Sequence, residues 1–319
     1  MKNNFSQKIS TQKVLFVLGK GGVGKTILSA SLAQYFSSKN EKVLIVQWAL
    51  KDSISPIYDL APCGHQTVTL PCGFSVMNYN SSETIREYFL QHLKMKLIYN
   101  LVIENKHVQK FIKAAPGIAE LFFLGRLFWL SELSKSNESN KFDRIIVDAP
   151  ATGHGVSLFK IAKTISNLGI TGPLAKECER VQNLLNDSSK TGYFITSIPE
   201  ELPYEEMKKL TQEMQKNLNY SPLGIFLNLS IHKYVSKEKT KDITIYFEGL
   251  SSDFKSKDSV SDLYHLKNIL MDRNKIEALS QTWCQENNFP CFLIPDQSLI
   301  QKNISDREIV DLVTKEMNL

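Results

Sequence analysis

Seven short apolar segments recur along the chain, and most are continuous hydrophobic runs rather than alternating ones. They occupy residues 14–18, 43–47, 74–78, 144–148, 193–197, 224–228 and 291–295. Segments with apolar positions at helical spacing lie between them, at residues 26–39, 83–99, 117–134, 174–186, 204–219 and 266–286. Continuous apolar runs predict strands covered on both faces. Their alternation with helices predicts an α/β fold, doubly wound around a mostly parallel sheet.

The alternation of strands and helices is interrupted twice. Residues 81–140 have helical patterns and are too long for a simple crossover, so we expect a helical subdomain inserted there in a single domain spanning 13–319. Residues 231–263 are rich in Lys, Ser and Asp. We expect them to form a solvated, partly disordered polar insertion, with a partner-docking arm as the alternative. Residues 1–12 are polar and are interpreted as an N-terminal tail.

The clearest chemical signal is a glycine-rich loop between the first predicted strand and the first predicted helix. Its expected nucleotide-binding residues are Gly19, Lys20, Gly21, Gly22, Val23, Gly24, Lys25, Thr26 and Ile27. Glycines let backbone N–H groups point at phosphate oxygens, and the following helix adds its positive end. The pattern predicts a P-loop, in which Lys25 reaches the β- and γ-phosphates and the Thr26 hydroxyl holds Mg²⁺.

A second motif follows the fourth predicted strand, which ends in Asp148. The residues after it read Ala149-Pro150-Ala151-Thr152-Gly153-His154. A carboxylate at the end of a strand beside a P-loop is where a Walker B aspartate holds Mg²⁺ through water. We therefore expect Asp148 to share the metal ion with Thr26.

Both motifs resemble those of a known family. The Lys-Gly-Gly-Val-Gly-Lys-Thr loop is similar to the deviant Walker A loop of the class that contains MinD, the nitrogenase iron protein and ArsA. The string from Asp148 to His154 resembles switch II of the ArsA family, which includes the arsenite-pump ATPase and the ATPase that delivers tail-anchored membrane proteins. Segments 115–121, 172–175 and 198–203 are also similar, so the resemblance covers most of residues 13–229 and the strand at 291–295.

The resemblance implies ATP and Mg²⁺ as cofactors, ATPase activity and a dimer, since the chain has one nucleotide site. It also implies that Lys20 reaches the nucleotide of the other subunit, although contact with its own phosphates or with solvent is the alternative. Asn228 and Pro295 match the family's base-binding positions, with a structural cap or turn as the alternative for each. On this basis Lys20, Lys25 and Asp148 are the expected catalytic residues, with Asp52 as a fourth candidate.

The chain departs from the family at switch I, where an aspartate orients the attacking water. Our alignment places Ala49 at that position and Leu50 at the following proline. A methyl group accepts no hydrogen bond, so either Asp52 substitutes for the missing carboxylate or hydrolysis is weak. Two hypotheses follow. The first is a working ATPase, as a homodimer or heterodimer, that couples slow hydrolysis to an opening and closing cycle read out by the helical subdomain. The second is a non-catalytic ATP-binding subunit of a heterodimer with a competent ArsA-like paralogue.

The remaining features bear on partners and location. Residues 118–130 are apolar nearly all round a helix, which predicts burial, with an exposed groove for a protein client or membrane partner as the alternative. The zinc CxxC pair and the metalloid cysteine triad of family members are absent, which makes the arsenite-pump and tail-anchored targeting functions less favoured. The net charge of +5 comes without a dense basic stripe, so we expect no nucleic-acid partner. Five scattered cysteines and the lack of a signal or spanning segment predict a cytoplasmic protein.

Overall fold

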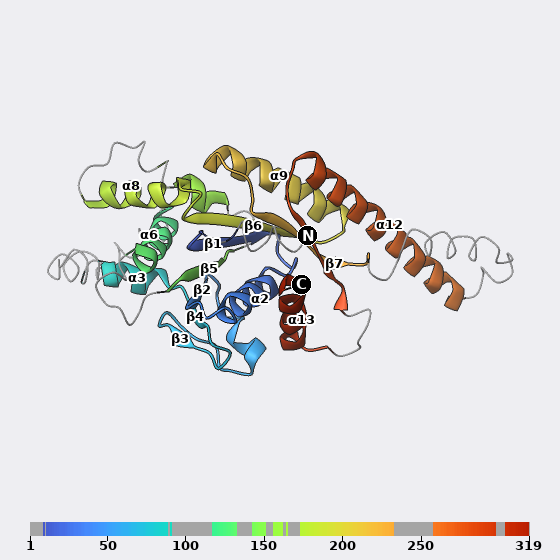
Figure 1. Cartoon of the computed structure of the whole chain (residues 1–319), viewed down its shortest axis with the longest axis horizontal. Coiled ribbons are helices and arrows are strands. Elements are labelled where there is room, and N and C mark those ends of the chain that lie inside the picture. Colours follow the sequence, from blue (N-terminus) through green and yellow to red (C-terminus); the bar gives the residue numbers. More distant parts are fainter. Residues whose placement is uncertain are drawn as a thin grey trace.

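The computed structural model describes residues 9, 11–88, 90, 117–132, 142–150, 156–161, 164, 173–232, 258–297 and 304–318. In this part of the chain, eight strands form a sheet in the order β3-β4-β2-β5-β1-β6-β7-β8 (Figure 1). They are β1 (Val14–Gly19), β2 (Val43–Gln47), β3 (Val68–Thr69), β4 (Ser75–Asn78), β5 (Arg144–Asp148), β6 (Thr191–Ser197), β7 (Gly224–Ser230) and β8 (Cys291–Pro295).

Helices cover both faces of this sheet. They are α2 (Lys25–Ser37), the 3₁₀ helix η1 (Ser55–Tyr58), α3 (Ser81–Glu87), α6 (Ile118–Glu132), α8 (Pro173–Asn186), α9 (Glu201–Leu218), α12 (Asp258–Glu286) and α13 (Asp306–Asn318). In Figure 1, α8, α9 and α12 lie above the sheet, whereas α2 and α13 lie below it. This arrangement confirms the predicted doubly wound α/β fold.

All seven predicted strands are present, and they pair in parallel with their neighbours in the sheet. β3 was not predicted; it pairs antiparallel with β4 at the edge of the sheet. Its two residues, Val68 and Thr69, are both exposed. A strand this short and exposed leaves no apolar run in the sequence, which explains the omission.

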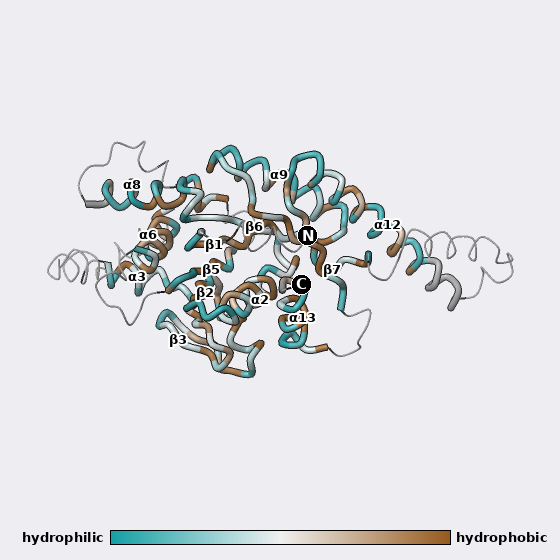
Figure 2. The backbone as a smooth tube through the Cα atoms, in the orientation of Figure 1, coloured by the Kyte–Doolittle hydropathy of each residue, from teal (hydrophilic) through white to brown (hydrophobic). Residues whose placement is uncertain are grey.

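The side chains of β1 show why its apolar run is continuous. Val14, Phe16 and Leu18 enter the core beneath α6, α8 and α9, whereas Leu15 and Val17 enter the opposite core, against α2 and α13. Figure 2 shows the resulting hydrophobic colour in the central strands and along α6. Both faces of the strand are therefore dry, and every position must be apolar.

No residue of helix α6 is exposed, which fits the burial that the sequence predicts. Phe123, Leu124 and Leu127 are buried, and Phe122 and Trp129 are partly buried. The aromatic side chains of this helix therefore do not form an exposed patch. Helices α3 and α6 both lie in the segment predicted as an inserted subdomain, 81–140, but the rest of that segment falls mostly outside the described residues, so the subdomain stays a prediction.

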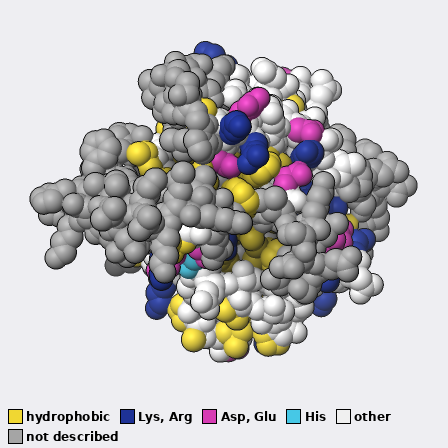
Figure 3. Space-filling view, turned by 90° about the vertical axis from the view of Figure 1, so that its left-hand side faces the viewer, with side chains coloured by type: hydrophobic (Ala, Val, Ile, Leu, Met, Phe, Trp, Pro, Cys, Tyr) yellow, Lys and Arg dark blue, Asp and Glu magenta, His cyan; other side chains and the backbone are white. Residues whose placement is uncertain are grey.

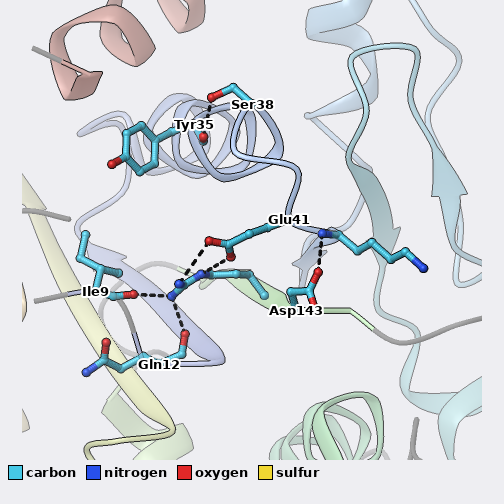
Figure 4. A network of polar contacts seen from close by, with 8 residues as sticks. Ile9, Gln12, Tyr35, Ser38, Glu41 and Asp143 are labelled. Atoms are coloured by element: carbon cyan, nitrogen blue, oxygen red, sulfur yellow. Dashed lines mark hydrogen bonds and ion pairs between the residues drawn. The ribbon is translucent and has the colours of Figure 1, made fainter. Parts of the chain in front are cut away.

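Two other predicted boundaries concern segments that are only partly described. Most of the polar insertion predicted at 231–263 lies outside the described residues, and α12 already begins at Asp258. The predicted tail contains Ile9 and Gln12. Their carbonyl oxygens accept hydrogen bonds from Arg144 at the start of β5, which also pairs with Glu41 (Figure 4). Ile9 is buried, so this part of the segment packs against the domain.

Helix α13 was not predicted. It packs against α2, and Gln34 of α2 donates a hydrogen bond to Asp311 over 2.6 Å. The Thr314 hydroxyl also donates to the carbonyl oxygen of Ser31, over 3.3 Å. The helix that follows the glycine-rich loop is thus held from outside by the last described helix. No helix in the described ranges is both long and apolar enough to cross a membrane.

Candidate nucleotide site

The glycine-rich loop lies at the carboxyl end of β1, the strand between β5 and β6. Gly22 and Gly24 have φ angles of 83° and 93°, a left-handed conformation that L side chains rarely adopt. A Cβ atom on Gly24 would lie 2.3 Å from Asn228 Nδ2. Gly21 and Gly22 are exposed. The loop therefore turns tightly at glycine and presents its backbone to solvent at the start of α2.

Lys25, the first residue of α2, curls back over this loop. Its Nζ donates a hydrogen bond to the carbonyl oxygen of Lys20 over 2.7 Å. Burial lowers the pKa of Lys25, while the charge of Asp148 opposes that shift. The ammonium group is thus held inside the loop, close to an acidic partner.

Thr26 and Asp148 meet behind the loop. The Thr26 hydroxyl donates a hydrogen bond to Asp148 Oδ2 over 2.9 Å, and Gln47 Nε2 donates to the same oxygen over 2.7 Å. Burial raises the pKa of Asp148, against the opposing effects of Gln47, Thr26, the charge of Lys25 and the Ser29 side chain. The second oxygen, Oδ1, is buried and has no hydrogen-bond partner at normal geometry among the described residues. A buried carboxylate oxygen with an unused acceptor, beside a hydroxyl, fits a Mg²⁺ site in which water is also a ligand.

Lys20 points to a different element. Its Nζ lies 3.1 Å from Glu206 Oε1 on α9, and both side chains are about one third exposed, at 35% and 32%. The residue expected to act across a dimer is therefore paired within its own chain.

Figure 3 looks onto the end of the molecule where α3, α6 and α8 lie, and it shows acidic and basic side chains beside hydrophobic ones.

The loop after β2 is the segment aligned with switch I. Ala49 is exposed, and the Leu50 side chain is fully exposed. Asp52 points the other way: its Oδ1 accepts hydrogen bonds from the backbone N–H groups of Ile54 and Ser55, and its Oδ2 accepts one from Cys63. Burial acts to raise the pKa of Asp52, but the Ser55 side chain and the backbone N–H groups of Cys63 and Ile54 lower it. Both oxygens are thus engaged in holding the local backbone.

The two predicted base-binding residues lie on neighbouring strands. Asn228 Nδ2 donates a hydrogen bond to the carbonyl oxygen of Val23 in the glycine-rich loop over 3.1 Å. Pro295 ends β8 and is paired in register with Ser230 at the end of β7. The sheet therefore brings Asn228 to the loop directly and places Pro295 at the end of the next strand.

Two residues that contact this site, Gln47 and Glu206, were not predicted from the sequence. Gln47 is the polar residue that ends an apolar strand run, a signal that marks the carboxyl edge of a sheet and could have identified it. Glu206 is one of several acidic residues near the start of α9. Only the packing of α9 distinguishes it from Glu205, so the sequence held no usable signal.

A parallel sheet whose central strand leads through a glycine-rich loop into a helix, with Thr26 and a strand-end Asp148 behind the loop, defines the P-loop NTPase class. A sequence model of the family described as Anion-transporting ATPase matches residues 12–170, which include both motifs. The chain belongs to the ArsA-like ATPase family.

Individual relatives agree with this assignment. The chain is 27% identical to the ATPase BagA of Mycobacterium tuberculosis over 233 residues, covering 70% of this chain and 68% of the relative. It is 27% identical over 280 residues to a protein of Aquifex aeolicus provisionally named arsenical pump-driving ATPase 2, covering 74% and 89%. It is 30% identical to an ATPase ASNA1 homolog of Cryptosporidium parvum over 252 residues, covering 68% and 64%.

Proposed function

We propose that this chain binds Mg²⁺–ATP at the glycine-rich loop and acts in the cytoplasm as a dimeric, ATP-dependent switch with slow hydrolysis. The observation that carries the proposal is the contact between Thr26 and Asp148, because the described residues give the buried Oδ1 of that carboxylate no hydrogen-bond partner. Membership of an ATPase family supports the same function.

The residues of the loop divide the binding task. The exposed N–H groups of Gly21 and Gly22 are positioned to bind phosphate oxygens, and the positive end of α2 supports the charge. Lys25 replaces its bond to the Lys20 carbonyl with bonds to the β- and γ-phosphates. Thr26 and Asp148 hold Mg²⁺, which neutralises charge on the phosphates when it is bound.

The position of Lys20 supports the proposed dimer. The chain supplies one such loop, and Lys20 becomes available after its half-buried ion pair with Glu206 opens. Surface ion pairs of this kind contribute about 0–1 kcal/mol, so a second polyphosphate can compete for the lysine. We propose that Lys20 then contacts the nucleotide of the partner subunit.

The side chains in the loop after β2 support the proposed slow hydrolysis. Ala49 has no acceptor for a water molecule, and Asp52 uses both carboxylate oxygens on backbone N–H groups. Neither residue is therefore ready to orient the attacking water. This observation also supports a second candidate function, an ATP-binding subunit without turnover that pairs with a competent ArsA-like paralogue.

Isothermal titration calorimetry with Mg²⁺–ATP tests the nucleotide site. We expect Lys25→Ala to lose ATP binding, because the lysine supplies the positive charge inside the loop. Lys216→Ala is the matched control, since Lys216 is exposed near the end of α9, away from the loop. Equal ATP affinity for both variants would overturn the proposal.

A further inference from the structure

Gln47 links two parts of the site that are separate in the sequence. It ends β2, is 1% exposed and is the register partner of Asp148 on β5. Its Nε2 donates to Asp148 Oδ2 over 2.7 Å and to the Ser53 hydroxyl over 2.9 Å. Its Oε1 accepts a hydrogen bond from the Ser53 backbone N–H over 3.0 Å. One side chain therefore holds both the strand-end carboxylate and the end of the loop.

A glutamine suits this position because its amide has donors and an acceptor on the same planar group. Its carbonyl oxygen accepts a hydrogen bond from the Ser53 backbone, and its nitrogen donates both to the Ser53 hydroxyl and to Asp148. A glutamate would place a second carboxylate beside Asp148, and a leucine would leave the buried carboxylate without one of its two donors. The geometry requires the amide, which is expensive to bury unless all its groups are paired.

The segment closed by this contact is the loop from Trp48 to Ser53. At its start, the Trp48 ring packs against Tyr79 and Phe123, with ring centroids 5.3 and 4.9 Å away. At its end, Ser53 is bound by Gln47. Ala49 and the fully exposed Leu50 lie between these two anchors. The base of the loop is thus fixed at its start by ring packing and at its end by Gln47, next to the backbone that Asp52 holds.

We propose that Gln47 is a positioning residue that couples Asp148 to the loop 48–53, so that a rearrangement of the Asp148 carboxylate moves Ala49 and Leu50. Asp148 Oδ2 is shared by Thr26 and Gln47, and a turn of the carboxylate changes both hydrogen bonds together. Because the Gln47 amide is rigid, a shift at Nε2 is carried to Ser53. The role of this coupling in a nucleotide cycle rests on the proposed function, but the coupling itself does not.

A double-mutant cycle tests the coupling without nucleotide. The measured quantity is the hydrogen–deuterium exchange rate of the Ser53 amide in the ligand-free chain. We expect Asp148→Ala to speed this exchange about fivefold, which corresponds to about 1 kcal/mol, because Gln47 loses one hydrogen bond. In a Gln47→Leu background, Asp148→Ala should have no further effect. Equal effects of Asp148→Ala in both backgrounds would overturn the coupling.

A second readout uses Trp48, made the sole tryptophan by Trp129→Phe and Trp283→Phe. We expect Mg²⁺–ATP to change its fluorescence, and we expect Gln47→Leu to remove most of that change while calorimetry still detects ATP binding. Gln34→Leu is the matched control, because Gln34 also donates to a carboxylate but on α13. A full fluorescence change in Gln47→Leu contradicts the coupling.

The two readouts also separate the two proposals. If the unmutated chain shows no ATP binding in calorimetry, the proposed function fails, whereas the exchange cycle still decides the role of Gln47. If Gln47→Leu does not fold, Ser53→Ala provides the second variant, because it removes the hydroxyl that Gln47 contacts and keeps the backbone N–H. With Ser53→Ala, the effect of Asp148→Ala on the exchange rate of the backbone N–H at residue 53 should be weaker. An effect of unchanged size would overturn the coupling.

Discussion

Lys20 Nζ and Glu206 Oε1 are 3.1 Å apart, which joins the glycine-rich loop to α9 in the isolated chain. Glu206 has its other oxygen, Oε2, buried without a hydrogen-bond partner among the described residues. An acidic side chain thus stands next to the loop that we propose to bind polyphosphate. Entry of a phosphate at Lys20 separates this pair, so the contact belongs to the ligand-free state of our proposal.

Removing the acidic partner of Lys20 should favour the dimer. We expect Glu206→Gln to tighten ATP-dependent dimerisation by about fivefold, which corresponds to an ion pair near the surface worth about 1 kcal/mol. Lys20→Ala should remove the effect of ATP on dimerisation. Sedimentation velocity with ATP and with ADP measures both. A chain that stays monomeric with ATP, even together with an ArsA-like paralogue, would contradict the proposed dimer.

Restoring a carboxylate in the loop after β2 should accelerate hydrolysis. We expect Ala49→Asp to raise the single-turnover rate by about 10²–10⁴, the usual contribution of a positioned proton acceptor. Asp52→Ala should leave the rate unchanged but destabilise the fold by about 1–2 kcal/mol, because three backbone N–H groups lose their acceptor. A fall in rate with Asp52→Ala would instead identify Asp52 as the catalytic group.

The hydroxyl of Thr26 should determine how strongly Mg²⁺ supports ATP binding. We expect Thr26→Ala to lower the affinity for the metal at least about tenfold, because a ligand and a hydrogen bond to Asp148 are both lost. Thr26→Ser keeps the hydroxyl and serves as the control. Calorimetric titrations with ATP at several Mg²⁺ concentrations give the comparison. A similar Mg²⁺ dependence in both variants would exclude Thr26 from the metal site.

Gly125 lies in the middle of α6, and a Cβ atom there would meet nothing within 4 Å. We expect Gly125→Ala to increase the free energy of unfolding by about 0.5–1 kcal/mol, because alanine loses less backbone freedom in a helix. Gly117→Ala is the opposite case, since Gly117 has a φ angle of 89° and its Cβ would lie 2.0 Å from Ile161 Cδ1. Urea denaturation should show one variant stabilised and the other destabilised.

The strands and the glycine-rich loop could be predicted because their physical requirements are local. A strand buried on both faces, such as β1, needs a continuous apolar run, and the turn before α2 needs glycine. The contacts of Gln47 and Glu206 could not be predicted in the same way. Gln47 meets Asp148 only because β2 and β5 pair in a particular register, and Glu206 meets Lys20 only because of how α9 packs.

The position of α13 has a consequence for synthesis. This helix is made after every described strand, yet it covers α2, whose first turn carries Lys25 and Thr26. On the ribosome, the nascent P-loop helix is therefore exposed along the side that Asp311 and Thr314 later contact. Domains generally fold as units during translation. Here α13 can pack on α2 only after the whole sheet has emerged from the ribosome. Until then, the uncovered side of α2 can aggregate or bind chaperones.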